Sequence, residues 1–375
     1  MAYSPIDSRS LARQTGSWLG TEGPDADVVI SCRVRLARNV EGVPFMTRIE
    51  ADRAEQLSHD LRLALLDARI DGETRWVPMT DASPVLRLLL LERNLISRDL
   101  LPRDAQSTAP GRAVAFGETE TVSVMVNEED HVRLQALAAG FDLDLAWQRA
   151  EILDRYLEDR VTFATSSRLG YLTGCPTNVG TGLRASVMLH LPALGMVRSE
   201  LEKVFSAAQR TGLAVRGMHG EGSRAAGDLY QISNQVTLGR CERDLIDDLR
   251  ALVPEIVRFE RRMRATLVDE MSSALHDRIT QSFGTLRTSR AIPTDAALAH
   301  LSYVRLGLHT GLFEGTRIEV LNELGLQVQR GHIQVLQAPG EEDDLLDASE
   351  RDKLRASYLR KRLAGYGPRG NGNGN

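Results

Sequence analysis

The sequence lacks several features that mark particular classes of protein. Its three cysteines, Cys32, Cys175 and Cys241, are far apart and include no Cys-x-x-Cys pair, so we expect neither a disulfide framework nor a cysteine-ligated zinc ion. No run of about 18 apolar residues occurs, and the N-terminal stretch has no apolar segment of the signal-peptide kind. We therefore expect a reduced, soluble, cytoplasmic protein without a membrane-spanning helix.

Lysine is also scarce, and arginine carries nearly all the positive charge. Lysine occurs only at Lys203, Lys353 and Lys361, although basic residues number 46 against 51 acidic ones. The net charge of −5 argues against direct nucleic-acid binding by the protein as a whole, but it leaves room for a local basic pocket. With 42% hydrophobic and 26% charged residues, the composition is that of an ordinary globular protein.

The apolar pattern divides the 375 residues into a mixed part and a helical part. Residues 1–16 are polar and are expected to be flexible. Strand-like runs and helical periods alternate up to about residue 240, whereas helical periods dominate after it, which places a domain boundary near residue 264. We therefore expect one domain over 17–263, a helical domain over 264–363 and a disordered tail, rich in glycine and asparagine, over 364–375.

Local signals place individual elements within these domains. Apolar residues at helical spacing predict a helix over 54–68, and Ser83 followed by Pro84 predicts the start of another. Two strand-like runs around the polar segment 117–120 predict a hairpin, and Asp142 is expected to cap a helix. The expected helices of the C-terminal part cover 245–266, 268–283, 293–306, 316–329 and 349–363.

The order of these elements favours an α+β fold, in which helices flank an antiparallel sheet. The first part has hairpins and lacks the regular strand–helix–strand alternation of a Rossmann fold. It also lacks the G-x-x-x-x-G-K-[ST] motif, so a nucleotide would have to be bound without a P-loop.

Arginines at alternate positions form the first candidate site. Arg33 and Arg35 are expected on one face of a strand, because successive side chains of a strand point to opposite faces. Two adjacent guanidinium groups repel each other unless an anion lies between them, and a polyphosphate suits that position. Alternatively, Arg33, Arg35 and Arg38 are solvated charges at the edge of a strand. The spacing does not decide between an anion-binding site and such solvated charges.

Acidic residues and a glycine-rich loop form the next candidates. Glu128, Glu129 and Asp130 directly follow a buried strand, where a carboxylate could act as a base, hold a cation or belong to a solvated turn. The loop over 174–182 is rich in glycine, whose backbone N–H groups can approach an anion closely. Its Cys175 is either a thiolate activated by a nearby cation or an inert, buried thiol.

Two further segments carry unusual charges. Arg216 and Glu221 lie in one glycine-rich segment, which could also be a plain surface loop. On the last expected helix, Arg351 and Arg355 are four residues apart and share a face, whereas Asp352 points about 100° away from Arg351. A solvated, charged helix has the same pattern.

Together, these segments suit the phosphorylation of a guanidinium group. A guanidinium has a pKa above ~12 and is a poor nucleophile, so it must be held in line and relieved of a proton. Paired carboxylates can do both, because their geometry matches a guanidinium bidentately. Several arginines and a magnesium ion would neutralise the phosphates during the transfer.

Four long stretches carry a family resemblance: SCRVRLARNVEGVPF, VNEEDHVRLQ, YLTGCPTNVGTGLRASVMLHLP and RGMHGEGSRAAGDLYQISNQVTLG. They are similar to the catalytic domain of the phosphagen (guanidino) kinases. The segment SWLGTEGPDADVVIS, the absence of that family's helical N-terminal domain and the segment RDKLRA resemble the McsB branch, the bacterial protein-arginine kinases. The resemblance spans about residues 17–362.

The resemblance implies a role for each candidate residue. Glu129 and Glu221 would clamp and activate the guanidinium, and Cys175 would lie beside it. Arg351, Asp352 and Arg355 would bind phosphoarginine. The residues implied in ATP binding are Ser31, Arg33, Arg35, His131, Arg133, Arg184, Arg216 and Glu221.

The resemblance also implies ATP with Mg²⁺ as cofactor, no metal ion held by the protein itself, and arginine-containing proteins as substrates. It implies marking of these proteins for a Clp protease under stress, an adaptor of the McsA type, and dimerisation through the helical domain. Two alternatives remain, a kinase for a small guanidino metabolite such as free arginine, and a phosphoarginine-binding regulator with an inactive kinase domain. The sequence departs from residues common in relatives at Cys32, Asn94 and Arg98.

Overall fold

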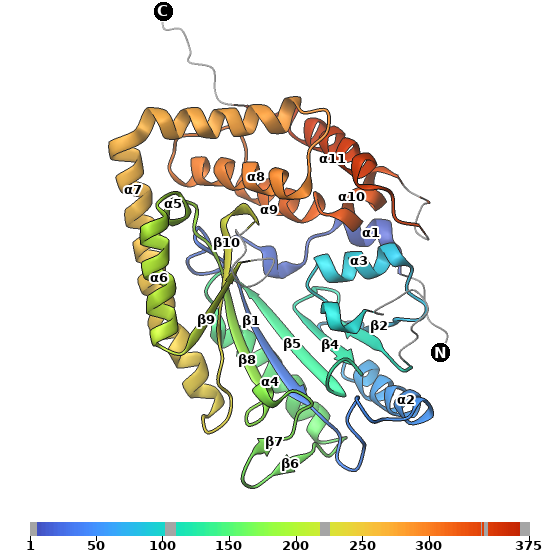
Figure 1. Cartoon of the computed structure of the whole chain (residues 1–375). Helices are drawn as coiled ribbons and strands as arrows, with labels where there is room; N and C mark the ends of the chain where they lie inside the picture. The colour runs from blue at the N-terminus through green and yellow to red at the C-terminus, as the bar shows by residue number, and fades with distance from the viewer. Residues whose placement is uncertain (1–5, 102–109, 218–225, 339, 341–343, 368–375) are drawn as a thin grey trace, which may run out of the picture.

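The computed structural model describes residues 6–101, 110–217, 226–338, 340 and 344–367. An antiparallel sheet of eight strands lies at its centre, in the order β2-β3-β4-β5-β1-β8-β10-β9 (Figure 1). Its strands are β1 (Val29–Arg38), β2 (Arg75–Pro78), β3 (Ala113–Phe116), β4 (Val122–Val126), β5 (Val132–Ala139), β8 (Leu183–His190), β9 (Leu213–Gly217) and β10 (Leu229–Asn234). Strands β6 (Thr165–Ser166) and β7 (Gly170–Tyr171) form a separate small hairpin.

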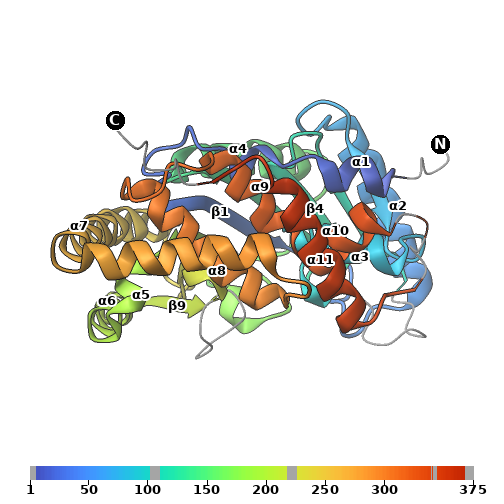
Figure 2. The ribbon, with the colours of Figure 1, turned by 90° about the horizontal axis from the view of Figure 1, so that it is seen from above.

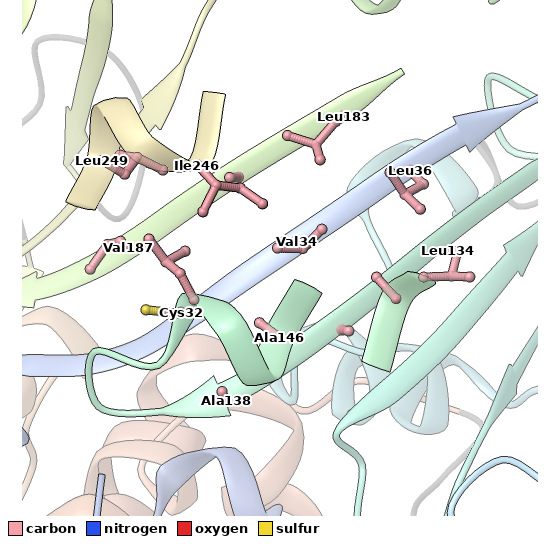
Figure 3. Packing of buried hydrophobic residues seen from close by; sticks show 14 of the residues in the cluster. Cys32, Val34, Leu36, Leu134, Ala138, Ala146, Leu183, Val187, Ile246 and Leu249 are labelled. Atoms are coloured by element: carbon pink, nitrogen blue, oxygen red, sulfur yellow. The ribbon is translucent and has the colours of Figure 1, made fainter. Parts of the chain in front are cut away.

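Helices cover one face of the central strands and bury it. Alternate residues of β1 and β8, including Val34 and Val187, belong to one core cluster with Ala146 and Ile246 on two of these helices (Figure 3). Because successive side chains of a strand alternate between faces, the opposite face of the same strands is left for polar residues. Between residues 51 and 288 the described helices are α2 (Ala51–Asp67), α3 (Pro84–Glu92), α4 (Leu143–Glu158), α5 (Pro192–Met196), α6 (Arg198–Arg210) and α7 (Glu242–Thr288). Of these, α3 packs in a separate core cluster.

Helix α7 connects the sheet to the C-terminal helices. Its backbone leaves helical geometry at Met271, where φ is −132°, and its two halves run along the side of the sheet and then over the top (Figure 1). The second half packs with the later helices around a core that includes Phe283, Leu301, Leu324 and Leu359 (Figure 2). Those helices are α8 (Thr294–His309), α9 (Ile318–Gln327), α10 (Arg330–Gln337) and α11 (Ala348–Arg362).

The N-terminal segment is more ordered than its composition predicts. Helix α1 (Ser8–Arg13) begins at Asp7, whose side chain accepts a hydrogen bond from the backbone N–H of Arg9 at 3.0 Å. Leu11 is buried in a third core cluster between α3 and α10. The expectation of a flexible segment over 1–16 therefore fails for these residues, because one buried leucine anchors a short helix. Residues 1–5 lie outside the described part.

Most local predictions are confirmed. Ser83 caps α3 through Leu86, Asp142 caps α4, and β3 and β4 form the expected hairpin. Two helices expected after residue 245 are one helix, α7, which continues through residue 264. The expected helix over 316–329 is shorter, and α10 follows it as a separate element. The last residues, 368–375, lie outside the described part.

Within the described ranges, no helix is both long enough and apolar enough to cross a lipid bilayer.

Candidate active site

The polar face of the sheet brings four predicted arginines together. Arg35 on β1 lies directly opposite Arg184 on β8, and Arg133 on β5 is two positions along from the residue that faces Arg35 on the other side. Arg33 lies one pleat further along β1 on the same face. The expected alternation is therefore confirmed, and the register adds a cross-strand arginine pair that no local pattern could predict. Like charges directly opposite each other destabilise a sheet.

The two arginines of β1 show the electrostatic cost of this arrangement. Burial and the neighbouring charges of Arg133 and Arg184 lower the pKa of Arg33 to about 10. Burial, followed by the charge of Arg33, lowers the pKa of Arg35 well below its usual value. Nε of Arg35 is buried and has no hydrogen-bond partner in the described part of the chain. A bound anion would relieve both the repulsion and the missing contact.

These arginines line a hollow of about 420 Å³, which we call the basic hollow. Carboxylate and thiol groups line the hollow as well. It therefore contains arginines that can bind an anion and carboxylates that can bind a cation. Its lining residues are Arg33, Arg35, Ser97, Asp99, Glu129, Arg133, Cys175, Thr177, Asn178, Arg184, Met188, Arg216, Gly217 and Gln231.

The turn that carries the acidic residues is held by buried contacts. Glu128 is bound to Arg133 at 2.5 Å, and burial would raise its pKa, but this charge and its hydrogen bonds outweigh burial and lower the pKa. Asp130 accepts hydrogen bonds from Asn39 at 2.6 Å and from the backbone N–H of Gly174 at 2.5 Å. The acidic turn and the glycine-rich loop are thus fixed against each other.

Glu129 is the acidic residue of the turn that reaches the basic hollow. Its side chain is exposed, unlike those of Glu128 and Asp130. Partial burial and the charge of Asp130 raise the pKa of the Glu129 carboxyl group. A raised pKa makes a carboxylate a better proton acceptor near neutral pH, which is the property required of a general base.

Cys175 lies in the wall of the same hollow. It is half-buried, and its Sγ is 3.0 Å from Oγ1 of Thr177. The loop approaches the acidic turn so closely at Gly174 that a Cβ there would meet the carbonyl oxygen of Glu129 at 2.8 Å. This approach explains why a glycine precedes Cys175, and the side chains of Cys175 and Glu129 both line the hollow.

Two residues implied in ATP binding, His131 and Ser31, do not line the basic hollow. His131 is fully buried; its Nδ1 accepts a hydrogen bond from the N–H of Val40, and its Nε2 lies 2.9 Å from the carbonyl oxygen of Pro44. Both ring nitrogens are therefore engaged in holding the segment after β1, and burial lowers the pKa of the ring. Ser31 lines a second, apolar cavity next to the hollow.

This apolar cavity, of about 150 Å³, lies between the sheet and the C-terminal helices. It shares Arg33, Met188 and Gln231 with the basic hollow, so the two cavities are adjacent. Gln231 also accepts a hydrogen bond from NH2 of Arg33 at 3.0 Å. The helices α8 and α9 contribute the apolar side chains Leu298, Leu301, Leu321 and Leu326.

Glu221, the second predicted carboxylate, lies outside the described residues. Arg216, at the end of β9, lines the basic hollow, and its backbone pairs with that of Gln231. Strand β9 ends at Gly217, which also lines the hollow.

The C-terminal candidates do not present two guanidinium groups to solvent. Arg355 is buried, and it donates hydrogen bonds to the carbonyl oxygens of Val328 at 2.6 Å and Ile292 at 2.8 Å, and to Asp352 at 2.6 Å. Arg351 is half-buried and donates to the carbonyl oxygen of Leu346. The structure thus gives Arg355 the task of holding Asp352 and joining α11 to the segments beside it.

Sequence reasoning missed several residues of the hollow. Ser97 and Asp99 come from a segment whose local pattern marks only a short turn, η2 (Arg98–Leu100). Gln231 carries no charge and lies in strand β10. Only the pairing of β10 with β8 and β9 brings it to the hollow. The only local signal was that Gln231 is a polar residue between the apolar residues Tyr230 and Ile232.

Comparison with known proteins identifies relatives of both parts of the chain. Residues 57–263 match the family described as ATP:guanido phosphotransferase, C-terminal catalytic domain, and residues 272–372 match the protein-arginine kinase McsB C-terminal domain. A protein-arginine kinase of Halothermothrix orenii is 41% identical over 94% of this chain and 98% of its own length. One from Bacillus subtilis is 40% identical, covering 92% and 93%.

Solved structures show the same likeness in the fold. The duplicated taurocyamine kinase of Schistosoma mansoni, with bound transition-state analogue components, matches with a TM-score of 0.58 and 26% identity, over 70% of this chain and 36% of its own. A lombricine kinase matches with a TM-score of 0.58 and 24% identity, over 71% of this chain and 75% of its own.

Proposed function

The chain belongs to the phosphagen kinase family, and on that basis we propose that it transfers the γ-phosphoryl group of ATP to arginine side chains of proteins. The observation that carries this proposal is the basic hollow, where Arg35 and Arg184 face each other beside Glu129 and Cys175. Such an arrangement has a place for a polyphosphate and, next to it, a place for a guanidinium group.

The two adjacent cavities each bind one part of the nucleotide. The triphosphate occupies the basic hollow, where its charge offsets the repulsion among the arginines. The base occupies the apolar cavity beyond Met188 and Gln231. Magnesium arrives as the ATP complex, because Mg²⁺ is usually held by substrate phosphates together with one or two carboxylates.

The acidic side of the hollow binds the acceptor. Glu129 pairs with the substrate guanidinium, orients one nitrogen in line with the γ-phosphorus, and accepts its proton. A P–N bond forms as the P–O bond to ADP breaks, and ADP leaves with the electron pair. Arg33, Arg35 and Arg184 hold the phosphate oxygens, where charge is concentrated during transfer. Cys175, beside Glu129, contacts the same guanidinium.

The type of bond formed tests this function. After incubation with ATP and casein, we expect phosphorylation that is lost in acid and survives base, as a P–N bond requires, and modified arginines in mass spectrometry at mild pH. Free arginine as acceptor tests the alternative of a small-molecule kinase. Acid-stable phosphate on the protein, or transfer to free arginine alone, contradicts the proposal.

Further roles of the protein are proposals that rest on the same family relationship. Its C-terminal domain binds phosphoarginine through Asp352, with Arg351 and Arg355 beside it. The phosphorylated proteins are delivered to a Clp protease in the cytoplasm, and an adaptor of the McsA type regulates the kinase, which acts as a homodimer. Affinity purification on a substrate protein that carries phosphoarginine tests the delivery to the protease. Light scattering of the purified kinase tests the dimer.

A further inference from the structure

The basic hollow contains a carboxylate, Asp99, to which the binding of the nucleotide and of the reacting guanidinium assigns no role. Asp99 lines the hollow together with Glu129 and Arg133. Its side chain is exposed, and its carboxylate has no hydrogen bond or ion pair with any described residue. Phosphates would be repelled by this group. The nearby cation Arg133, on which its charge acts, is already ion-paired with Glu128, so the Asp99 carboxylate is open to a positively charged ligand.

The backbone that carries Asp99 is held firmly against the site. Oγ of Ser97 accepts hydrogen bonds from the N–H groups of Asp99 at 3.1 Å and Leu100 at 3.3 Å, and it donates to Glu128. The carbonyl oxygen of Asp99 accepts a hydrogen bond from Arg112 at 2.6 Å. Because Glu128 is in turn bound to Arg133, the position of Asp99 is tied to that of the phosphate-binding arginines.

Asp99 lies on the acidic side of the hollow. Its charge acts on both Glu129 and Arg133, which places it close to the residue that we assign to the reacting guanidinium. A polypeptide that inserts one arginine toward Glu129 must keep its backbone and the neighbouring side chains at the mouth. Asp99, an exposed carboxylate in the wall of the hollow, is open to those neighbouring side chains.

We propose that Asp99 is a specificity-determining residue, which binds a second cationic side chain, lysine or arginine, next to the reacting arginine of a polypeptide substrate. The proposal rests on the placement of the reaction in the basic hollow. The protein should therefore prefer arginines that have a basic residue nearby in the substrate, because Asp99 binds that basic residue.

Two peptides test the preference, each with one arginine, flanked in one by lysines and in the other by glutamines. In the wild type we expect KM for the lysine peptide to be lower by about two- to five-fold, the size expected of an exposed ion pair. Asp99→Asn should bring the ratio of the two KM values close to one, and Asp99→Glu should restore part of it. KM for ATP should stay unchanged, and added salt should reduce the preference.

Asp277→Asn is the matched control, because Asp277 is an exposed aspartate on the second half of α7. It should keep the wild-type ratio. An unchanged ratio in Asp99→Asn, or no preference in the wild type, would show that Asp99 is only a solvated surface charge. Glu129→Gln, assayed on the same peptides, distinguishes the proposed reaction site from the proposed role of Asp99. If Glu129→Gln keeps its activity, the placement of the reaction in the hollow is wrong. If Glu129→Gln is inactive and Asp99→Asn keeps the wild-type ratio of KM values, only the role of Asp99 is wrong.

Discussion

Two arginines of one strand have opposite roles because they point to opposite faces of the sheet. Arg38 is buried on the core side, where it binds Asp154 at 2.7 Å and lies over the ring of Tyr171. Arg35 lies on the polar face opposite Arg184. The first arginine stabilises the fold through a paired contact, whereas the second raises the energy of the empty site, a cost that the proposed binding of a phosphate anion would offset.

This difference predicts opposite effects of two alanine substitutions. Arg38→Ala leaves the Asp154 carboxylate buried without its partner and should reduce the free energy of unfolding by about 3–5 kcal/mol. Arg35→Ala removes a repulsion, so stability without nucleotide should not fall, while the affinity for ATP should drop about ten-fold or more. Urea unfolding and calorimetric titration of ATP check the two effects. Equal loss of stability in both variants would contradict the assignment.

The raised pKa of Glu129 predicts how activity depends on pH. A base is inactive once it is protonated, so kcat/KM should fall as the pH drops through this pKa, at a higher pH than an ordinary glutamate would give. Glu129→Gln cannot accept a proton and should lower turnover by ~10²-fold or more, with little change in ATP affinity. Steady-state kinetics over a series of pH values tests both. A variant with near-normal turnover would show that the base is another group.

At the scale of elements, one carboxylate joins the two parts of the molecule. Glu92 at the end of α3 accepts hydrogen bonds from the N–H groups of Gly331 at 2.8 Å and His332 at 3.1 Å, at the start of α10. Its Oε2 also lies 2.7 Å from Nδ1 of His332. Because Arg93 donates to Nε2 of the same ring, the ring proton is on Nδ1 and points to Glu92. Glu92 thus satisfies the N-terminal N–H groups of α10 from outside that helix.

Removal of this cap should weaken the contact between α3 and α10. Glu92→Ala leaves buried donors of α10 without an acceptor, and the free energy of unfolding should fall by about 1–3 kcal/mol. Glu55→Ala, an exposed substitution on α2, is the control and should change stability little. Thermal unfolding followed by circular dichroism measures both. A melting temperature equal to that of the control would show that water replaces the carboxylate at no cost.

At the scale of the whole molecule, the C-terminal helices wall the apolar cavity and carry the phosphoarginine candidates. Arg355 binds the carbonyl oxygens of Ile292 and Val328, so it connects α11 to the segments that precede α8 and α10. Asp352 is only partly buried and is held by Arg355. The partly exposed members of the motif are therefore Asp352 and Arg351, and Arg355 supports them.

This arrangement predicts which substitutions separate binding from folding. Arg351→Ala and Asp352→Asn should weaken the binding of free phosphoarginine while the fold is kept, since a charge-assisted contact contributes about 1.5–3 kcal/mol. Arg355→Ala should also lower the melting temperature, because two buried carbonyl groups lose their donor. Calorimetric titration of phosphoarginine without ATP, together with thermal unfolding, distinguishes these outcomes. Wild-type affinity in Arg351→Ala and Asp352→Asn would mean that they are solvated charges of α11.

The sequence by itself determined the features that depend on neighbouring residues. Ser83 and Asp142 cap helices through N–H groups three residues away, and the hairpin around 117–120 follows from two adjacent strand-like runs. The alternation of Arg33 and Arg35 also follows from strand geometry alone. These contacts lie within a few residues of each other, so local chemistry is sufficient to predict them.

Only the tertiary structure decided which residues share the site. The register of β1 with β8 places Arg35 opposite Arg184, and packing after β1 buries His131 away from the hollow. It also brings Asp99 into the wall and turns Arg355 inward. Register and burial arise from the packing of segments far apart in the chain, and a local pattern contains no information about them. The same kind of charged residue therefore lines the candidate site at one position and holds the fold together at another.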